Sequence, residues 1–240
     1  MRKILFSLIC FFLFGSVSYA GPCLTTIASA STNQLACADD DILNVTSAGS
    51  ITYNDHKAVD LEDISGVQIT NDGTIQTEDG TNKQKAIHAE SSLNTTITNN
   101  GTINSDNNEG IILDYAENVI ITNNAGATIS AEGNNAISGR NVGNCHFNGA
   151  NCHSDLSGQS NGVGLTLHNY GTITSAHETI WLGSGSSGNH RSKGLKIYNY
   201  DGGIIKTTDE GDSPIKAFHL VDFEFVNYKG GTIEGADRHA

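Results

Sequence analysis

The sequence predicts an all-β protein, a single right-handed parallel β-helix of about seven three-stranded coils. A short motif returns along the chain, as ITNDGTI at residues 69–75, ITNNGTI at 97–103 and HNYGTI at 168–173. Triplets that alternate apolar, polar and apolar residues precede the motif, which is typical of half-buried strands. The composition, with two prolines, one methionine and 27 glycines, favours short strands joined by polar turns over helices.

Residues 1–20 are expected to be a signal peptide, and the predicted β-helix does not include them. Arg2 and Lys3 precede an apolar run over residues 4–14, and residues 18–20 end on a small residue that suits signal peptidase. This run is too short for a transmembrane helix, which needs roughly 20 apolar residues. We therefore expect that the chain is exported and contains no transmembrane segment.

Residues 21–41 are expected to form an N-terminal cap that carries a disulfide bond. Cysteines of an exported protein tend to oxidise and pair. Four cysteines follow the signal peptide and form two local pairs, Cys23 with Cys37 and Cys145 with Cys152, which is the simplest of the three possible connectivities. The first pair closes a short loop ahead of the first coil, where it would cover the core and an unpaired strand edge.

The β-helix is expected to occupy residues 42–240, and its repeat has a spacing of 24 to 28 residues where nothing is inserted. A unit of this length cannot bury its own apolar face, so the copies must stack. Equivalent strands would then pair at about 4.8 Å and their inward side chains would form files. The isoleucines that close the copies are Ile51, Ile75, Ile103, Ile129, Ile173, Ile205 and Ile233.

An asparagine at the corner of each repeat is expected to hydrogen-bond to its equivalents in a ladder along the solenoid. The glycine that follows would allow a sharp corner. The ladder asparagines are Asn71, Asn99, Asn123, Asn169, Asn199 and Asn227. Tyr170, Tyr200 and Tyr228 follow the last three of them, and a structural aromatic stack is favoured over a sugar-binding platform.

Two insertions, at residues 140–162 and 183–194, interrupt the repeat at the same corner of successive coils. They are expected to lie side by side as one protrusion, and such loops often carry recognition. The candidate ligand-binding residues in these loops are His146, His153, Asp155, His190, Arg191 and Lys193. This spot is basic and rich in imidazole, so an anionic glycan or an acidic protein surface could bind there. Two variable loops without a shared role are the alternative.

The sequences Cys145-His146 and Cys152-His153 also bring together four donors of the kinds that zinc accepts. Oxidation would remove both thiolates, and the spacing between the two cysteines matches no common zinc motif. A disulfide bond is therefore favoured over a metal site. No metal and no cofactor are expected.

Charge disfavours two classes of partner. The chain has 13 Lys and Arg against 26 Asp and Glu, a formal net charge of −13. Without Arg2 and Lys3 the counts are 11 against 26, which gives −15. An acidic molecule of this kind is unsuited to nucleic acid and to anionic lipid.

Enzymatic signals are weak. Polysaccharide lyases and hydrolases with this fold need clustered carboxylates on one face. Residues 39–41 are three aspartates, but they precede the first coil, and His177-Glu178 is a lone polar pair at a turn. No nucleophile elbow, phosphate loop or HExxH motif occurs. Four further residues lie near one another in the repeat register without a matching second set: Asp60, His88, Asp114 and Trp181.

The signal peptide, the cysteine-paired segment 21–41 and the repeated Asn-x-Gly-Thr-Ile corners resemble the passenger regions of bacterial autotransporters. The resemblance covers essentially all of the mature chain. It implies an exported right-handed β-helix that a C-terminal outer-membrane barrel holds at the cell surface. No segment with the alternating strands of such a barrel follows Ile233, so we expect a passenger fragment of a longer autotransporter polypeptide.

The expected function is non-catalytic, as a cell-surface (outer membrane-associated) or secreted β-helix module in adhesion or surface display. The expected partner is a glycan or a protein on a host or neighbouring cell surface. A carbohydrate-active β-helix enzyme, a lyase or hydrolase, is the alternative and predicts a groove with converging carboxylates along one sheet. A phage or surface-layer fibre that trimerises is a third possibility.

Overall fold

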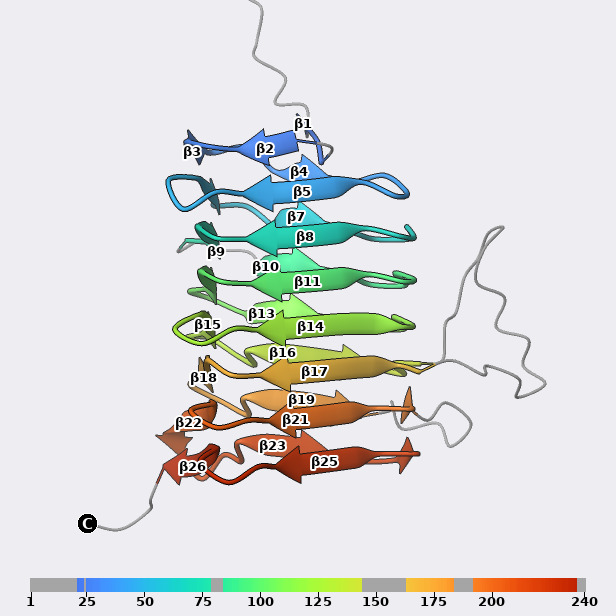
Figure 1. Cartoon of the computed structure of the whole chain (residues 1–240), viewed down its shortest axis with the longest axis vertical. Coiled ribbons are helices and arrows are strands. Elements are labelled where there is room, and N and C mark those ends of the chain that lie inside the picture. Colours follow the sequence, from blue (N-terminus) through green and yellow to red (C-terminus); the bar gives the residue numbers. More distant parts are fainter. Residues whose placement is uncertain (1–20, 24, 79–83, 144–162, 184–191, 237–240) are drawn as a thin grey trace, which may run out of the picture.

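The computed structural model describes residues 21–23, 25–78, 84–143, 163–183 and 192–236. Throughout this part of the chain the regular elements are short β-strands, which build three parallel sheets of eight strands each. The chain visits the three sheets in turn, and the coils stack along the long axis of the molecule (Figure 1). This arrangement confirms the predicted parallel β-helix.

The three sheets are named here A, B and C. Sheet A contains β1 (Gly21–Pro22), β4 (Leu35–Ala36), β7 (Lys57–Asp60), β10 (Lys85–His88), β13 (Glu109–Ile112), β16 (Ile137–Arg140), β19 (Ile180–Gly183) and β23 (Ile215–Ala217). Sheet B contains β2 (Thr25–Ile27), β5 (Ile42–Val45), β8 (Gln68–Asn71), β11 (Thr96–Asn99), β14 (Val119–Asn123), β17 (Leu165–Asn169), β21 (Lys196–Asn199) and β25 (Glu224–Asn227). Sheet C contains β3 (Ala30–Ser31), β6 (Ser50–Tyr53), β9 (Thr74–Thr77), β12 (Thr102–Ser105), β15 (Thr128–Ala131), β18 (Thr172–Ser175), β22 (Ile204–Glu210) and β26 (Thr232–Ala236). A separate pair joins β20 (Ser192–Lys193) to β24 (Leu220–Val221).

The isoleucines that close the repeats form one internal file along sheet C. Each pairs in register with its equivalent in the next coil, for example Ile75 with Ile103 and Ile103 with Ile129. These three side chains are completely buried. The fold is therefore stabilised by like residues that pack on like residues, as the sequence periodicity predicts.

The segment expected as a cap, residues 21–41, contributes strands to all three sheets. β1 and β4 pair with each other in sheet A, β2 pairs with β5 in sheet B, and β3 pairs with β6 in sheet C. A disulfide bond joins Cys23 to Cys37, whose Cα atoms lie 4.5 Å apart. The disulfide thus links the two strands that begin sheet A.

The glycine of the motif is required for a reason that differs from the expected one. Neither Gly73 nor Gly101 has a positive φ, so a left-handed backbone does not explain them. A Cβ atom on Gly101 would lie only 2.1 Å from the carbonyl oxygen of Gly73 in the preceding coil. The absence of a side chain therefore lets consecutive corners approach closely.

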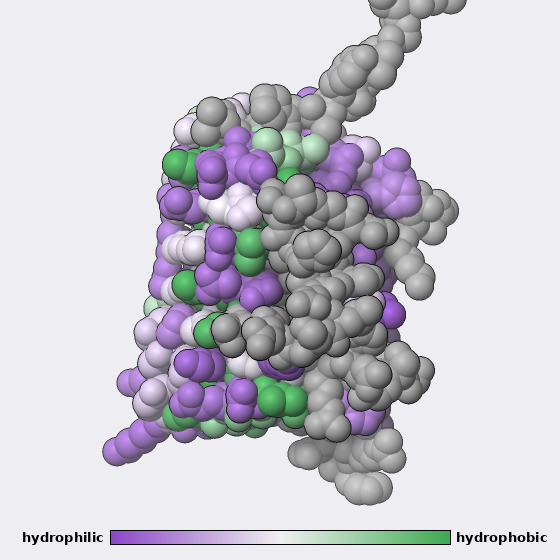
Figure 2. Space-filling model, turned by 90° about the vertical axis from the view of Figure 1, so that its right-hand side faces the viewer, coloured by the Kyte–Doolittle hydropathy of each residue, from purple (hydrophilic) through white to green (hydrophobic). Residues whose placement is uncertain are grey.

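Hydrophilic side chains alternate with small, separate hydrophobic spots over the described surface in Figure 2. Among the described residues, no helix has the length and the apolar character needed to cross a bilayer.

Candidate functional site

The corner asparagines form a continuous hydrogen-bonded ladder inside the solenoid. Five side-chain amides donate in turn to the side-chain oxygen of the next asparagine, at 2.7–2.9 Å. Each of these amides also donates to a backbone carbonyl at the start of the sheet C strand in the next coil, as Asn71 does to Thr102 of β12. The ladder begins at Asn71 because Val45 occupies the equivalent position in the preceding coil. The members are Asn71, Asn99, Asn123, Asn169, Asn199 and Asn227. All but Asn227 are completely buried, and only the side-chain oxygen of Asn71, at the start of the row, has no partner among the described residues. Such a row has a structural role.

The three corner tyrosines stack on one another outside this ladder. The rings of Tyr170 and Tyr200 are 4.2 Å apart and almost parallel, and those of Tyr200 and Tyr228 are 4.8 Å apart. Burial, followed by the hydrogen bond with Tyr170, raises the pKa of Tyr200 to about 12. Both faces of the central ring are covered, so the stack offers little aromatic face to a sugar.

The described ends of the two insertions lie together at the corner between sheets A and B. Arg140 pairs with Gly183 in register, so both segments leave sheet A at neighbouring positions. Where the chain returns from the second insertion, the backbone amide of Lys193 donates to the carbonyl of Val142, just before the first insertion. Of the six predicted ligand-binding residues, Lys193 alone belongs to the described chain, where β20 holds it. The others, and the cysteines of the second pair, lie outside the described residues: His146, His153, Asp155, His190, Arg191, Cys145 and Cys152.

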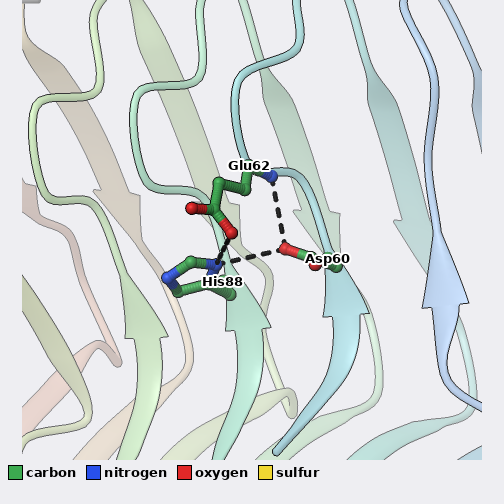
Figure 3. Close-up of side chains that lie close together, drawn as sticks. All are labelled: Asp60, Glu62 and His88. Atoms are coloured by element: carbon green, nitrogen blue, oxygen red, sulfur yellow. Dashed lines mark hydrogen bonds and ion pairs between the residues drawn. The ribbon is translucent and has the colours of Figure 1, made fainter. Parts of the chain in front are cut away.

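Asp60 and His88, which the register brings near each other, belong to a charged network on the outer face of sheet A (Figure 3). Nδ1 of His88 lies 3.1 Å from Oδ1 of Asp60, and its Nε2 lies 3.2 Å from Oε2 of Glu90. The ammonium of Lys57 contacts Asp60 at 3.0 Å and Glu62 at 2.7 Å. Lys57, Glu62 and Glu90 were not predicted as part of this group, although a signal exists: Lys57 pairs in register with Lys85, and a glutamate stands two residues after both Asp60 and His88.

The network stabilises the charged forms of Asp60 and Lys57. Burial, the largest influence, would raise the pKa of Asp60, but hydrogen bonds from His88 and Lys57 outweigh it and the net shift is downward. Burial would likewise lower the pKa of Lys57, yet Glu62 and Asp60 raise it overall. The oxygen and nitrogen atoms of Asp60, Glu62 and His88 are close enough to hold a metal ion. The ammonium of Lys57 contacts both carboxylates, so a cation already pairs with them and the arrangement is an ion-pair network.

The substitution Asp60→Asn should make the free energy of unfolding less dependent on pH in the acidic range. A carboxylate whose pKa is lowered in the folded state stabilises the fold fully when the pH is above its ordinary pKa, here 3.8. This stabilisation is lost as the pH falls through the pKa of the folded state. The difference in free energy of unfolding between wild type and variant should therefore shrink between pH 6 and pH 2. Urea unfolding followed by circular dichroism across this range measures it. Asp72→Asn, at an exposed corner, is the matched control, and a difference for Asp60→Asn that is constant with pH would contradict the prediction.

Asp114 and Trp181, the other two residues of the register group, line a hollow of about 430 Å³ on the outer face of sheet A. We call it the sheet A hollow. It lies across β13, β16, β19 and β23, and Glu109 and Glu178 also line it. His88 pairs in register with Ile112 at the edge of the hollow, so the four residues predicted as one group belong to two neighbouring places on the same face. The hollow was not predicted from the sequence, because its lining residues come from four coils that differ in the number of residues between equivalent positions.

The remaining acidic candidates serve local structure. Nδ1 of His177 lies 3.0 Å from Asp212, whereas Glu178 pairs with Lys216, so this adjacent pair has two separate partners. In the aspartate run at residues 39–41, side chains accept backbone hydrogen bonds from Ser65 and from Ala38. These contacts fit turn formation.

Comparisons with known proteins find no matching family model, no matching curated protein and no matching solved structure.

Proposed function

We propose that this chain is a non-catalytic, exported β-helix module that acts in adhesion or surface display, as part of a polypeptide of the autotransporter passenger type. One observation carries the proposal. The interior consists of a hydrogen-bonded asparagine ladder and apolar files, whereas the two long insertions depart from paired positions, Arg140 and Gly183, at one corner. A regular scaffold that presents two inserted segments at one edge suits attachment better than catalysis.

The signal-peptide pattern of residues 1–20 and the disulfide between Cys23 and Cys37 support export, since disulfides persist in oxidising compartments. A glycan or a cell-surface protein is the proposed partner. The location that follows is the outer surface of the cell or the medium.

A carbohydrate-active enzyme is the second candidate, because three carboxylates line the sheet A hollow. Their contacts weigh against it. Asp114 lies 3.4 Å from the guanidinium of Arg140, and Glu178 pairs with the ammonium of Lys216. Glu109 accepts a hydrogen bond from Asn134 at 3.0 Å. Asp114 and Glu178 are thus engaged in ion pairs rather than presented together as an acid and base pair.

Removal of the first insertion should abolish attachment and leave the solenoid intact. The backbones of Gly143 and Gly164 are in direct contact, so a glycine-serine pair can replace residues 144–162 and join Gly143 to Val163. Beads coated with this variant should attach to cell monolayers at least about tenfold less than wild-type beads. The circular dichroism spectrum should remain β-rich.

A second deletion, in which a glycine-serine pair replaces residues 79–83 at another corner, is the control and should attach as the wild type does. Attachment that survives removal of residues 144–162 would contradict the assignment of adhesion to this edge. New reducing or unsaturated ends in polysaccharide incubated with the wild type would favour the enzyme.

A further inference from the structure

We infer that the sheet A hollow binds a neutral oligosaccharide along the solenoid axis, with Trp181 as its stacking surface. This inference rests on the proposed function and adds a glycan site on the sheet itself, separate from the attachment edge at the insertions. The floor of the hollow is one outward file, in which Ile112, Ser138, Trp181 and Lys216 pair in succession. Four parallel strands span roughly 14 Å, a length that suits a short oligosaccharide.

The indole of Trp181 is fixed in place and partly exposed. The ring of Phe218 lies 5.0 Å away at an interplanar angle of 73°, an edge-to-face contact that restrains the indole. In the part of the chain that the structure describes, no other ring is stacked parallel on it. A large, rigid aromatic surface beside polar groups is the usual feature of a site that recognises an amphipathic ligand such as a sugar ring.

The polar groups around Trp181 are held in defined positions. The carboxylate of Asp114 accepts the backbone amide of Arg140 at 2.8 Å and contacts its guanidinium. Glu178 is fixed by Lys216, and the side chain of Asn135 donates to the carbonyl of Glu178. Each carboxylate has further lone pairs and each cation has further N–H groups. This alternation of acceptors and donors matches neighbouring sugar hydroxyls, which both donate and accept.

The charge of the hollow favours a neutral ligand. Three carboxylates, Glu109, Asp114 and Glu178, face two cations, Arg140 and Lys216, so the formal sum is −1. The chain as a whole carries −13. The negative charge of the hollow and that of the whole chain would both repel an anionic glycan. A neutral glycan would experience no such repulsion.

Trp181 is the only tryptophan of the chain, so its fluorescence reports directly on the hollow. Full-length mature protein should be titrated with cellohexaose, maltohexaose, laminarihexaose, mannohexaose and hexa-N-acetylchitohexaose, with hexagalacturonate as the anionic comparator. At least one neutral hexasaccharide should change the emission saturably, and hexagalacturonate should not. The same titrations by calorimetry provide a readout that does not depend on the indole.

Trp181→Ala should weaken calorimetric binding by about tenfold or more, Trp181→Phe should restore part of it, and Glu178→Gln should also weaken it. Tyr228→Ala, which removes an exposed aromatic ring from the tyrosine stack, is the matched control and should bind as the wild type does. Circular dichroism and the urea midpoint verify that each variant is folded.

Three results would overturn the inference: no response to any neutral hexasaccharide at millimolar concentration, tighter binding of hexagalacturonate, or unchanged calorimetric affinity in Trp181→Ala. Each of them leaves the proposed function standing if wild-type beads still attach to cells. Loss of all attachment by the wild type, with saccharide binding retained, overturns the proposed function alone.

Discussion

Replacement of Asn123 by alanine should lower the free energy of unfolding by about 3 kcal/mol. The side chain of Asn123 is completely buried and accepts a hydrogen bond from Asn99 at 2.9 Å. It donates to Asn169 at 2.9 Å and to the carbonyl of Thr172 at 3.1 Å. Alanine removes all three bonds and leaves their partners buried, and each loss costs on the order of 1 kcal/mol. Urea unfolding monitored by far-ultraviolet circular dichroism measures the change.

Asn124→Ala provides the matched control, because this neighbouring amide donates to Asn100 in an exposed row outside the core. Its effect should stay within about 0.5 kcal/mol, as for most surface substitutions. If the two substitutions lowered the free energy of unfolding equally, the buried ladder would contribute no more to stability than the exposed row.

The ladder and the isoleucine file could be predicted because a solenoid places each motif position on its own equivalent. Asn99 meets Asn71 and Asn123, and Ile103 meets Ile75 and Ile129. A recurring residue type therefore identifies a contact directly, without knowledge of handedness or twist. The same logic explains why inward positions, which carry repeated residues, were the predictable ones.

Outward and terminal positions could not be predicted in this way. Along sheet A, the outward file that includes Ser138 and Trp181 repeats no residue type from coil to coil. These side chains do not belong to the internal files, so many combinations are tolerated there and the sequence contains no periodic signal for the sheet A hollow. The strands of the segment 21–41 likewise carry no recurring signal, since Ala30 and Ser31 pair with Ser50 and Ile51 without any motif of their own.

Ile103→Ala should destabilise the protein by about 3 kcal/mol, within the range of roughly 2–5 kcal/mol for large-to-alanine changes in a core. The side chain of Ile103 is completely buried between Ile75 and Ile129, in register with both. The close approach of consecutive corners prevents the coils from collapsing into the space, so a cavity should remain. Thermal and urea unfolding of the variant measure the loss.

Ile120→Ala is the matched control, because it deletes the same atoms from a side chain that is 39% exposed on the outer face of sheet B. It should change the free energy of unfolding by less than about 1 kcal/mol. The contrast between the two variants isolates burial from the loss of β-branched propensity, which they share. Similar losses at both positions would mean that strand propensity, rather than the internal file, determines the stability of the solenoid. A loss confined to Ile103→Ala would instead show that neighbouring coils depend on one another through this file.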